Sequence, residues 1–382
     1  MIKNIYFLLL YCASSFTLYK MIQLVFDDKP SRREILNKIL LESRNITLPV
    51  SGNILIKSEN FTALSLLLNH YRERIDLVYI DPPFNTMQDF FISDRRANSV
   101  SSVKEHRAYT DKMTPEKFLA FMYERLIIIH ELLSVRGSLY LHIDCKTGHY
   151  VKIILDEIFG TENFINDIAR IKSNPKNFYR RAWGNERDMI LFYAKDSRYN
   201  IWNDIKDSIN SDELARRFPK IDSQGRRYTT IPLHAPGETR DGVTGQAWRN
   251  IPVPEGRHWR TDPAEFDRLD SLGLIEWSKT GNPRIIKYAD EHNGKKIQDV
   301  WTFKDPQNPV YPTEKNHDML KLIIAQSSLP ESIILDCFAG SGASLLCASE
   351  LGRHWIGIDK SKQAINIMRK NLTCEYAFIE LQ

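Results

Sequence analysis

Residues 332–359 read SIILDCFAGSGASLLCASELGRHWIGID, and their pattern indicates the fold class. It contains two short apolar runs, 332–336 and 355–359, that are typical of buried strands, and residues 343–351 between them have helical spacing. A glycine-rich turn joins the first run to the helix. Because strand, helix and strand follow one another directly, the stretch predicts a parallel sheet with helices on its faces, which is an α/β fold.

The same alternation of strands and helices is present in residues 51–195. The apolar run Ile75–Ile80 predicts a buried strand, and Thr114 followed by Pro115 predicts the start of a helix that runs to Gly137. Further strands are expected at 53–57, 138–143 and 189–193, and further helices at 61–71, 149–159 and 362–371.

Between these two stretches, residues 196–300 lose the alternation and become rich in Arg, Trp, Gly and Pro. A chain of 382 residues also exceeds the usual size of one domain. We therefore predict an N-terminal segment, 1–50, an α/β domain made of residues 51–195 and 301–382, and a separate domain, 196–300, inserted between its two halves.

The composition is that of an ordinary globular protein, with 42% hydrophobic and 26% charged residues. The formal net charge of +4 permits a polyanionic partner but does not require one. The five cysteines show neither a CxxC pair nor a His/Cys spacing that suits zinc, and their odd number argues against a secreted disulfide framework. We interpret them as reduced intracellular thiols, and expect a cytoplasmic protein without a metal site.

At the N-terminus, the apolar run 5–11 follows Lys3 and precedes small residues, a pattern that resembles a signal peptide. The run is too short to span a bilayer, and nothing later in the chain indicates secretion. Met21 offers a second start. We therefore interpret residues 1–50 as an accessory segment or a mispredicted start, and expect no membrane partner.

The segment Asp336–Gly342 (DCFAGSG) runs from a predicted strand through a glycine turn into a helix, so its backbone comes close to a ligand at the helix N-terminus. Asp359 ends the next strand, where a carboxylate can accept hydrogen bonds from the two hydroxyls of a ribose. Leu345 replaces the third glycine of the dinucleotide fingerprint, which disfavours NAD and FAD and leaves S-adenosylmethionine as the better fit. Each feature alone also fits a structural role, a tight turn for the glycines and a helix N-cap for Asp359.

The segment Asp81-Pro82-Pro83-Phe84 directly follows the strand predicted at 75–80. The amino group of a nucleobase is a poor nucleophile because its lone pair is conjugated with the ring, and acceptors on both N–H groups favour the form whose lone pair can attack a methyl group. Asp81 can provide one acceptor and the Pro82 carbonyl the other, held rigidly by the two prolines. Phe84 can stack on a base rotated out of a duplex. The alternative is a proline-terminated strand with a solvated aspartate.

Together, the two segments resemble motifs of the DNA methyltransferases that modify amino groups, at adenine N6 or cytosine N4. The catalytic segment precedes the cofactor segment, an order that resembles the β group of this family, which includes the modification subunits of type III restriction systems. The resemblance implies a Rossmann-like S-adenosylmethionine-dependent methyltransferase fold with circularly permuted motif order and an inserted target-recognition domain, 196–300. Residues 51–195 are then the catalytic half of the methyltransferase domain, and residues 301–382 the cofactor-binding half.

The resemblance also assigns site residues. The catalytic positions are Asp81, Pro82, Pro83 and Phe84. The cofactor-binding positions are Asp336, Phe338, Ala339, Gly340, Ser341, Gly342, Asp359, and two residues of the segment YPTEK, Thr313 and Lys315. Phe84 stands where Tyr is common in the family, and Glu314 where Gln is frequent. A Phe ring still stacks on a base, so the first departure puts little in doubt.

The expected insert combines basic and aromatic side chains, a composition suited to phosphate contacts, guanine edges and stacking on bases. The candidate DNA-binding residues are Arg226, Arg227, Trp248, Arg249, Arg257, Trp259 and Arg260. Any one of these arginines alone also fits a solvated surface charge. As a group, and in this location, the residues predict DNA recognition.

The sequence thus predicts a site-specific enzyme that methylates adenine N6 in double-stranded DNA by base flipping, with S-adenosylmethionine as cofactor. Asp81 favours adenine, because serine is more usual at this position in cytosine N4 enzymes. The alternatives are an N4-cytosine methyltransferase and a catalytically silent DNA-binding specificity subunit. The resemblance allows a homodimer and a restriction subunit as partners. No metal is expected, because displacement of a methyl group needs none.

Overall fold

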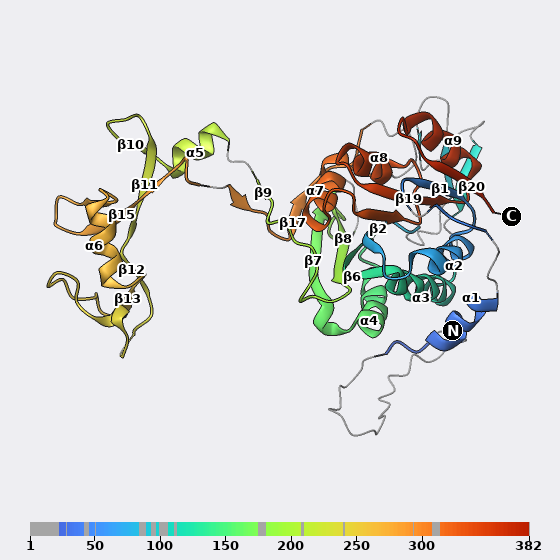
Figure 1. Ribbon diagram of the computed structural model, residues 1–382, viewed down its shortest axis with the longest axis horizontal. Coiled ribbons are helices and arrows are strands. Elements are labelled where there is room, and N and C mark those ends of the chain that lie inside the picture. Colours follow the sequence, from blue (N-terminus) through green and yellow to red (C-terminus); the bar gives the residue numbers. More distant parts are fainter. Residues whose placement is uncertain are drawn as a thin grey trace, which may run out of the picture. The chain divides into compact units, whose positions relative to one another are not determined.

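The computed structural model divides the chain into two compact units (Figure 1). The larger unit contains the residues up to Ile205 and from Gln298 onward, and the smaller unit spans Lys206–Ile297. The structure describes residues 23–27, 29–41, 46–49, 51–83, 89–92, 97–98, 106–110, 113–174, 181–207, 210–239, 241–292, 294–307 and 314–381. Phe84 and Thr313, two of the predicted site residues, lie outside these ranges.

Among the described residues, the larger unit contains a nine-stranded sheet in the order β17-β7-β8-β6-β2-β18-β19-β1-β20. Neighbouring strands are parallel except at β8, which is antiparallel to both β6 and β7. The strands are β1 (Ile54–Lys57), β2 (Ile75–Ile80), β6 (Leu133–Ile143), β7 (Phe164–Ile171), β8 (Arg187–Ala194), β17 (Val300–Thr302), β18 (Ile333–Asp336), β19 (His354–Asp359) and β20 (Ala377–Glu380). The predicted α/β, Rossmann-like fold is therefore confirmed.

Helices cover both faces of this sheet. Figure 1 shows one group on one face, namely α1 (Arg32–Leu41), α2 (Asn60–Tyr71), α3 (Pro115–Leu132) and α4 (Gly148–Phe159). The opposite face carries α7 (His317–Ser327), α8 (Ala343–Glu350) and α9 (Lys362–Asn371). A small antiparallel sheet of β3 (Asp89–Ile92), β4 (Ala97–Asn98) and β5 (His106–Thr110) follows β2 in the chain. No helix in the described ranges combines the length and apolar character needed to cross a membrane.

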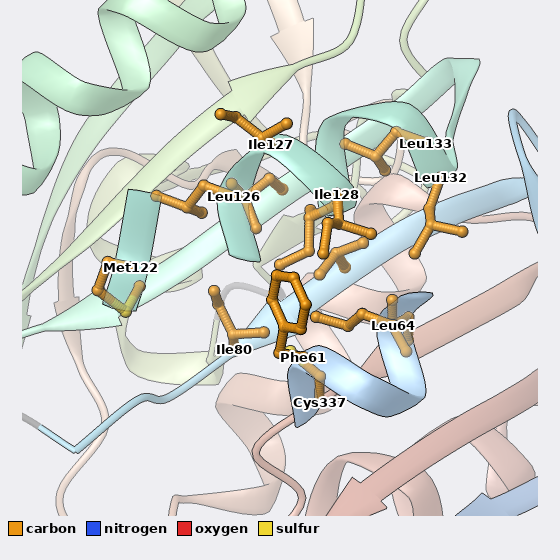
Figure 2. Close-up of a cluster of buried hydrophobic side chains, with 14 of the residues drawn as sticks. Phe61, Leu64, Ile80, Met122, Leu126, Ile127, Ile128, Leu132, Leu133 and Cys337 are labelled. Carbon is orange, nitrogen blue, oxygen red and sulfur yellow. The ribbon is translucent and has the colours of Figure 1, made fainter. Parts of the chain in front are cut away.

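A large hydrophobic core lies between the sheet and the helices α2 and α3. Figure 2 shows Phe61 and Leu64 of α2 close to Leu126 of α3, Ile80 of β2 and Cys337, which follows β18. All five are buried, and removing each large apolar side chain from water contributes about 1.5–3 kcal/mol. The core therefore extends to the carboxyl ends of β2 and β18 and holds both ends firmly in place.

The helix α3 ends earlier than predicted. Its start is as expected, because the Thr114 side chain accepts a hydrogen bond from Lys117 N at 3.4 Å and Pro115 opens the first turn. The helix ends at Leu132 rather than near Gly137, since residues from Leu133 onward pair with β2 as strand β6. A Cβ at Gly137 would lie 2.7 Å from the carbonyl oxygen of Ile75, so this glycine permits close strand pairing and is not a helix stop.

The smaller unit contains a four-stranded antiparallel sheet and a separate two-stranded one. The larger sheet has the order β10 (Lys220–Ile221), β11 (Arg227–Pro232), β15 (Pro283–Tyr288) and β14 (Ile275–Trp277), and β12 (His234–Pro236) pairs with β13 (Arg257–Trp259). Its described helices are α5 (Ser211–Arg217) and α6 (Pro263–Ser271), and β9 (Lys206–Asp207) pairs with β16 (Lys295–Lys296) where the chain enters and leaves.

The segment 196–205, which the sequence analysis placed in the insert, packs on the larger unit. Ile201 N donates to Arg136 O at 3.1 Å, and Asn203 Nδ2 donates to Ala325 O at 2.7 Å. The loss of regular alternation in this segment thus marks a connection on the surface of the larger unit, and the compact insert itself starts at Lys206.

Candidate active site

The parallel strands β2, β18 and β19 lie side by side, and each ends in or just before an aspartate, namely Asp81, Asp336 or Asp359. A cavity of about 430 Å³ opens at these carboxyl ends. Ligands of open α/β sheets bind at such edges, and small-molecule sites have volumes of about 300–1,000 Å³. The predicted site residues that line it are Asp81, Pro83, Lys315, Asp336, Phe338, Ala339, Gly340, Ser341 and Asp359.

Asp81 directly follows β2, and its two carboxylate oxygens differ in their surroundings. Oδ2 lies 2.5 Å from Lys315 Nζ. Oδ1 is buried and, within the part of the chain that the structure describes, has no hydrogen-bond partner. A buried acceptor without a partner costs about 1–3 kcal/mol or more, so Oδ1 is suited to accept a hydrogen bond from a bound ligand.

The glycine turn between β18 and α8 requires two left-handed backbone conformations. The φ angles are 53° at Gly340 and 79° at Gly342, which glycine adopts without steric cost. A Cβ at Gly342 would also lie 2.7 Å from Cγ of Met368, so α9 closes against this turn. Gly342 does not line the cavity itself; it shapes the turn that presents Gly340 to it.

Asp359 ties the glycine turn to the end of β19. Its Oδ2 accepts from Gly340 N at 2.9 Å and its Oδ1 accepts from Ser361 N at 2.8 Å. The N-cap of α9 is Ser361, whose side chain accepts from Ala364 N, so the alternative interpretation of Asp359 as that cap is wrong. Burial raises the pKa of Asp359. The carboxylate keeps further lone pairs, and the residue lines the cavity.

Asp336 stabilises the same turn by accepting hydrogen bonds from residues on both sides of it. It is 3% exposed, and it accepts hydrogen bonds from Phe338 N at 2.9 Å and from the Ser344 hydroxyl. Burial, followed by the negative charges of Asp81 and Asp359, raises the pKa of Asp336 to about 7, against the opposing effect of its two hydrogen bonds. The carboxyl ends of the central strands therefore concentrate negative charge around the cavity.

These features fit the predicted cofactor, S-adenosylmethionine. Its sulfonium and ammonium groups are positive and suit a cavity lined by carboxylates. The adenosyl group suits the apolar part of the lining, which includes Pro83, Phe121 and Phe338, and its ribose hydroxyls suit the carboxylate of Asp359. The left-handed turn lets the backbone at Gly340 come close to a ligand.

A buried polar chain that the sequence pattern does not reveal lies next to Asp81. Tyr79 Oη lies 3.1 Å from His142 Nδ1, His142 Nε2 lies 3.2 Å from Asp188 Oδ2, and Lys172 Nζ donates to Asp188 Oδ1 at 2.6 Å. Burial lowers the pKa of His142, which is therefore neutral at pH 7. Because the Asp188 carboxylate only accepts, Nε2 donates to it and Nδ1 accepts from the Tyr79 hydroxyl.

In the smaller unit, two predicted DNA-binding residues are core residues instead. Trp248 and Trp259 are each 2% exposed and pack against Phe266. Their indole nitrogens donate to Asp267 and to the carbonyl of Gln246. The prediction that these two rings stack on bases is therefore wrong, because a unit of this size needs large aromatic side chains to build its own core.

The predicted arginines fall into two groups. Arg226 and Arg249 form ion pairs within the unit, at 2.8 Å to Asp290 and 2.7 Å to Asp267, and Arg227 Nη1 lies 3.5 Å from the Phe218 carbonyl oxygen. Arg257 and Arg260 are exposed, and neither faces a carboxylate within ion-pair distance in the described ranges. With Arg284 they surround His234, whose pKa is lowered by burial and then by these three positive charges. We call Arg257, Arg260 and Arg284 the basic patch.

Comparisons with known proteins agree with this geometry. A family model described as DNA methylase matches residues 75–370. The type II methyltransferase M.EcaI of Enterobacter cloacae is 40% identical over 324 residues, which cover 83% of this chain and 69% of that protein. The StyLTI Mod subunit, from a type III restriction-modification enzyme of Salmonella typhimurium strain LT2, is 25% identical over 81% of this chain, which spans about half of that subunit's length.

Among solved structures, M1.HpyAVI in complex with SAM is 16% identical, with a TM-score of 0.45, and the match covers 84% of this chain and 100% of that one. The extent of the family match and the identity to M.EcaI place the chain in a family. The chain belongs to the DNA methylases that act on adenine N6 or cytosine N4 and take their methyl group from S-adenosylmethionine.

Proposed function

We propose that this protein methylates adenine N6 at a specific sequence of double-stranded DNA. The observation that carries the proposal is Asp81 Oδ1, a buried acceptor without a described partner at the edge of the cavity. The exocyclic amino group of a base is a donor of matching chemistry. The glycine turn, where the methyl donor is expected, lines the same cavity, so donor and acceptor groups can meet there.

In this proposal, Asp81 Oδ1 accepts a hydrogen bond from one N–H of the amino group and the Pro82 carbonyl accepts from the other. Two acceptors direct the nitrogen lone pair away from the ring system and toward the methyl group. S-adenosylmethionine supplies that group as an electrophilic methyl on sulfur. As the nitrogen–carbon bond forms and the carbon–sulfur bond breaks, the amino nitrogen must lose one proton, and Asp81 is placed to accept it.

The cofactor would be held by the residues around the glycine turn. Asp359 is assigned to the ribose hydroxyls, the Gly340 and Ser341 backbone to the methionine part, and the Phe338 ring to the adenosyl group. Each of these residues lines the cavity, which supports the assignment. Gly342 acts indirectly, since it sets the course of the turn.

The choice of adenine over cytosine rests on the first residue of the catalytic segment. A carboxylate at this position accepts hydrogen bonds from an amino group without donating any. The segment resembles that of adenine enzymes, in which aspartate is common. N4-cytosine methylation has the same mechanism and is the alternative that the experiment below separates.

The smaller unit is proposed to recognise the target sequence. The basic patch supports this role, because Arg257 and Arg260 are exposed and have no carboxylate partner among the described residues, which suits phosphates and guanine edges. Phe84, which lies outside the described residues, is proposed to stack on the flipped adenine. A homodimer and a restriction subunit are proposed partners, the latter because several relatives are named Mod subunits of type III restriction-modification enzymes.

The test is modified-base sequencing of DNA from a methylation-free bacterial host that expresses the chain. We expect N6-methyladenine at one recurring sequence, absent with Asp81→Ala. Asp76→Asn is the control, because Asp76 lies on the same strand, binds Ser134 and does not line the cavity. Detection of N4-methylcytosine would replace adenine by cytosine in the proposal. The absence of any modified base, with the wild type and with every variant, would refute the proposal.

A further inference from the structure

Lys315 lies against the carboxylate of Asp81, and both residues line the cavity. Its side chain is 9% exposed and that of Asp81 is 17% exposed, and Nζ lies 2.5 Å from Asp81 Oδ2. The next residue, Asn316, caps α7 by accepting from Met319 N at 3.1 Å, and its amide donates to the Lys304 carbonyl at 3.0 Å. Both bonds fix the backbone from which the Lys315 side chain extends.

Several ionisable groups lie around the ion pair between Lys315 and Asp81. The cavity is also lined by the carboxyl groups of Glu314, Asp336 and Asp359, and a negative charge on any of them repels a negative charge at Asp81. Two arginines of the same unit are engaged with other carboxylates. Arg125 pairs with Glu59 at 2.6 Å, and Arg170, which is fully buried, pairs with Asp305 at 2.6 Å.

The buried groups on neighbouring strands offer Asp81 no second cation. His142 is neutral at pH 7 because burial lowers its pKa, and Tyr79 remains protonated because burial and then the charges of Asp81 and Asp336 raise its pKa. Lys172 pairs with Asp188 at 2.6 Å. A largely buried carboxylate that loses its ion-pair partner is unfavourable, so the orientation of Asp81 depends on Lys315.

We propose that Lys315 is a positioning residue of the methyl transfer, which binds Oδ2 of Asp81 and so leaves Oδ1 as the acceptor for the amino group. This inference rests on the proposed function. It departs from the expectation that Lys315 binds the cofactor. The ion pair occupies one oxygen and fixes the plane of the carboxylate, and the unpartnered atom is the other oxygen of the same group.

The test compares Lys315→Met and Lys315→Arg in the full chain. The control is Lys29→Met, because Lys29 forms a similarly short and similarly buried ion pair, 2.6 Å to Glu157, away from the cavity. The dissociation constant for S-adenosylmethionine is measured by calorimetry. The kcat and KM are measured on a duplex that carries the sequence methylated by the wild type.

For Lys315→Met we expect kcat to fall about 100-fold, as for a misplaced catalytic group, while the cofactor dissociation constant changes less than about threefold. The kcat of Lys315→Arg should be at least about tenfold higher than that of Lys315→Met. The kcat of Lys29→Met should stay within about threefold of the wild-type value. In an Asp81→Asn background, Lys315→Met should cost less than about threefold more, because both residues act through one contact.

A cofactor dissociation constant raised at least tenfold, with kcat retained at saturating cofactor, would make Lys315 a cofactor ligand and overturn the inference. So would an unchanged kcat, or a full additional loss in the Asp81→Asn background. If Lys315→Met does not fold, Lys315→Gln gives the same comparison. Failure of the proposed function is distinct, since it appears in the wild type as the absence of methylated adenine.

Discussion

Asp359 Oδ2 accepts a hydrogen bond from the backbone nitrogen of Gly340 at 2.9 Å, across the gap between two neighbouring strand ends. The same carboxylate holds Ser361 N through its other oxygen. One side chain thus sets the separation of the two loops between which the adenosyl group is expected to bind. Its proposed ligand-binding role and its loop-fixing role are therefore coupled.

This coupling predicts that Asp359→Asn weakens cofactor binding more than a comparable change elsewhere. Asparagine keeps only one acceptor oxygen, so at least one charge-assisted hydrogen bond of about 1.5–3 kcal/mol is lost, which corresponds to a dissociation constant raised about 10–100-fold. Calorimetry with S-adenosylmethionine measures it. Asp222→Asn is the control, since Asp222 also accepts from two backbone nitrogens, in the smaller unit, and it should leave the constant unchanged. Equal binding by both variants would contradict the prediction.

Gly342→Ala should lower stability and abolish cofactor binding. A left-handed conformation costs a non-glycine residue about 1–2 kcal/mol, and the added Cβ also meets Met368 at 2.7 Å. Gly352→Ala separates the two effects, because Gly352 has a similar φ of 70° and open space around it. Thermal unfolding should show the larger loss for Gly342→Ala, and only that variant should fail to bind. Similar melting temperatures for the two would argue against a crowded turn.

The raised pKa of Asp336 predicts a specific pH dependence of stability. Below about pH 4 the folded and unfolded states both hold this proton, and between about pH 4 and 7 only the folded state does. The stabilising contribution of the protonated carboxyl is therefore lost as pH rises through this window, by about 1.4 kcal/mol per pH unit. Asp336→Asn lacks this loss. Its free energy of unfolding relative to wild type, from urea titrations, should rise from pH 5 to pH 7, and a constant difference would exclude the assignment.

The basic patch is the proposed DNA-binding surface of the smaller unit. Replacing Arg257 and Arg260 together by alanine should weaken duplex binding and reduce the slope of log affinity against log salt by about 2, since each lost phosphate contact removes about 0.9. Arg249→Ala is the control, because Arg249 is held by Asp267 and Asp270. Fluorescence anisotropy at several salt concentrations gives both values. An unchanged slope in the double variant would remove the patch from the interface.

The fold was predictable where strands are buried on both faces. The strands β2, β18 and β19 are continuous apolar runs, which is the usual pattern in parallel sheets, and their bounds differ from the prediction by at most one residue. β7 was missed, because its sequence FINDIARI mixes polar with apolar residues and its pairing with β8 is long-range. The early end of α3 was missed because Gly137 allows a close contact with the neighbouring strand, and the local sequence does not distinguish this role from a helix stop.

The active site was predictable to the extent that its residues lie at strand ends. Asp81 follows β2 directly, Asp359 ends β19, and Gly340 lies in the turn after β18, so topology alone brings them to one edge. The pairs Lys315–Asp81 and His142–Asp188 depend on packing across the sheet, and no sequence period reports them. In the smaller unit, the burial of Trp248 and Trp259 is likewise set by tertiary packing. The composition of this region therefore predicted that the two rings stack on DNA bases, whereas they form part of the hydrophobic core.

The most direct test of the central claim is mass spectrometry of nucleosides from duplex DNA incubated with the purified chain and methyl-labelled S-adenosylmethionine. The wild type should produce labelled N6-methyladenine. Asp81→Asn should produce it only at a small residual rate, while it still binds the cofactor in calorimetry. Labelled N4-methylcytosine, or labelled adenine at wild-type rate from Asp81→Asn, would contradict the account.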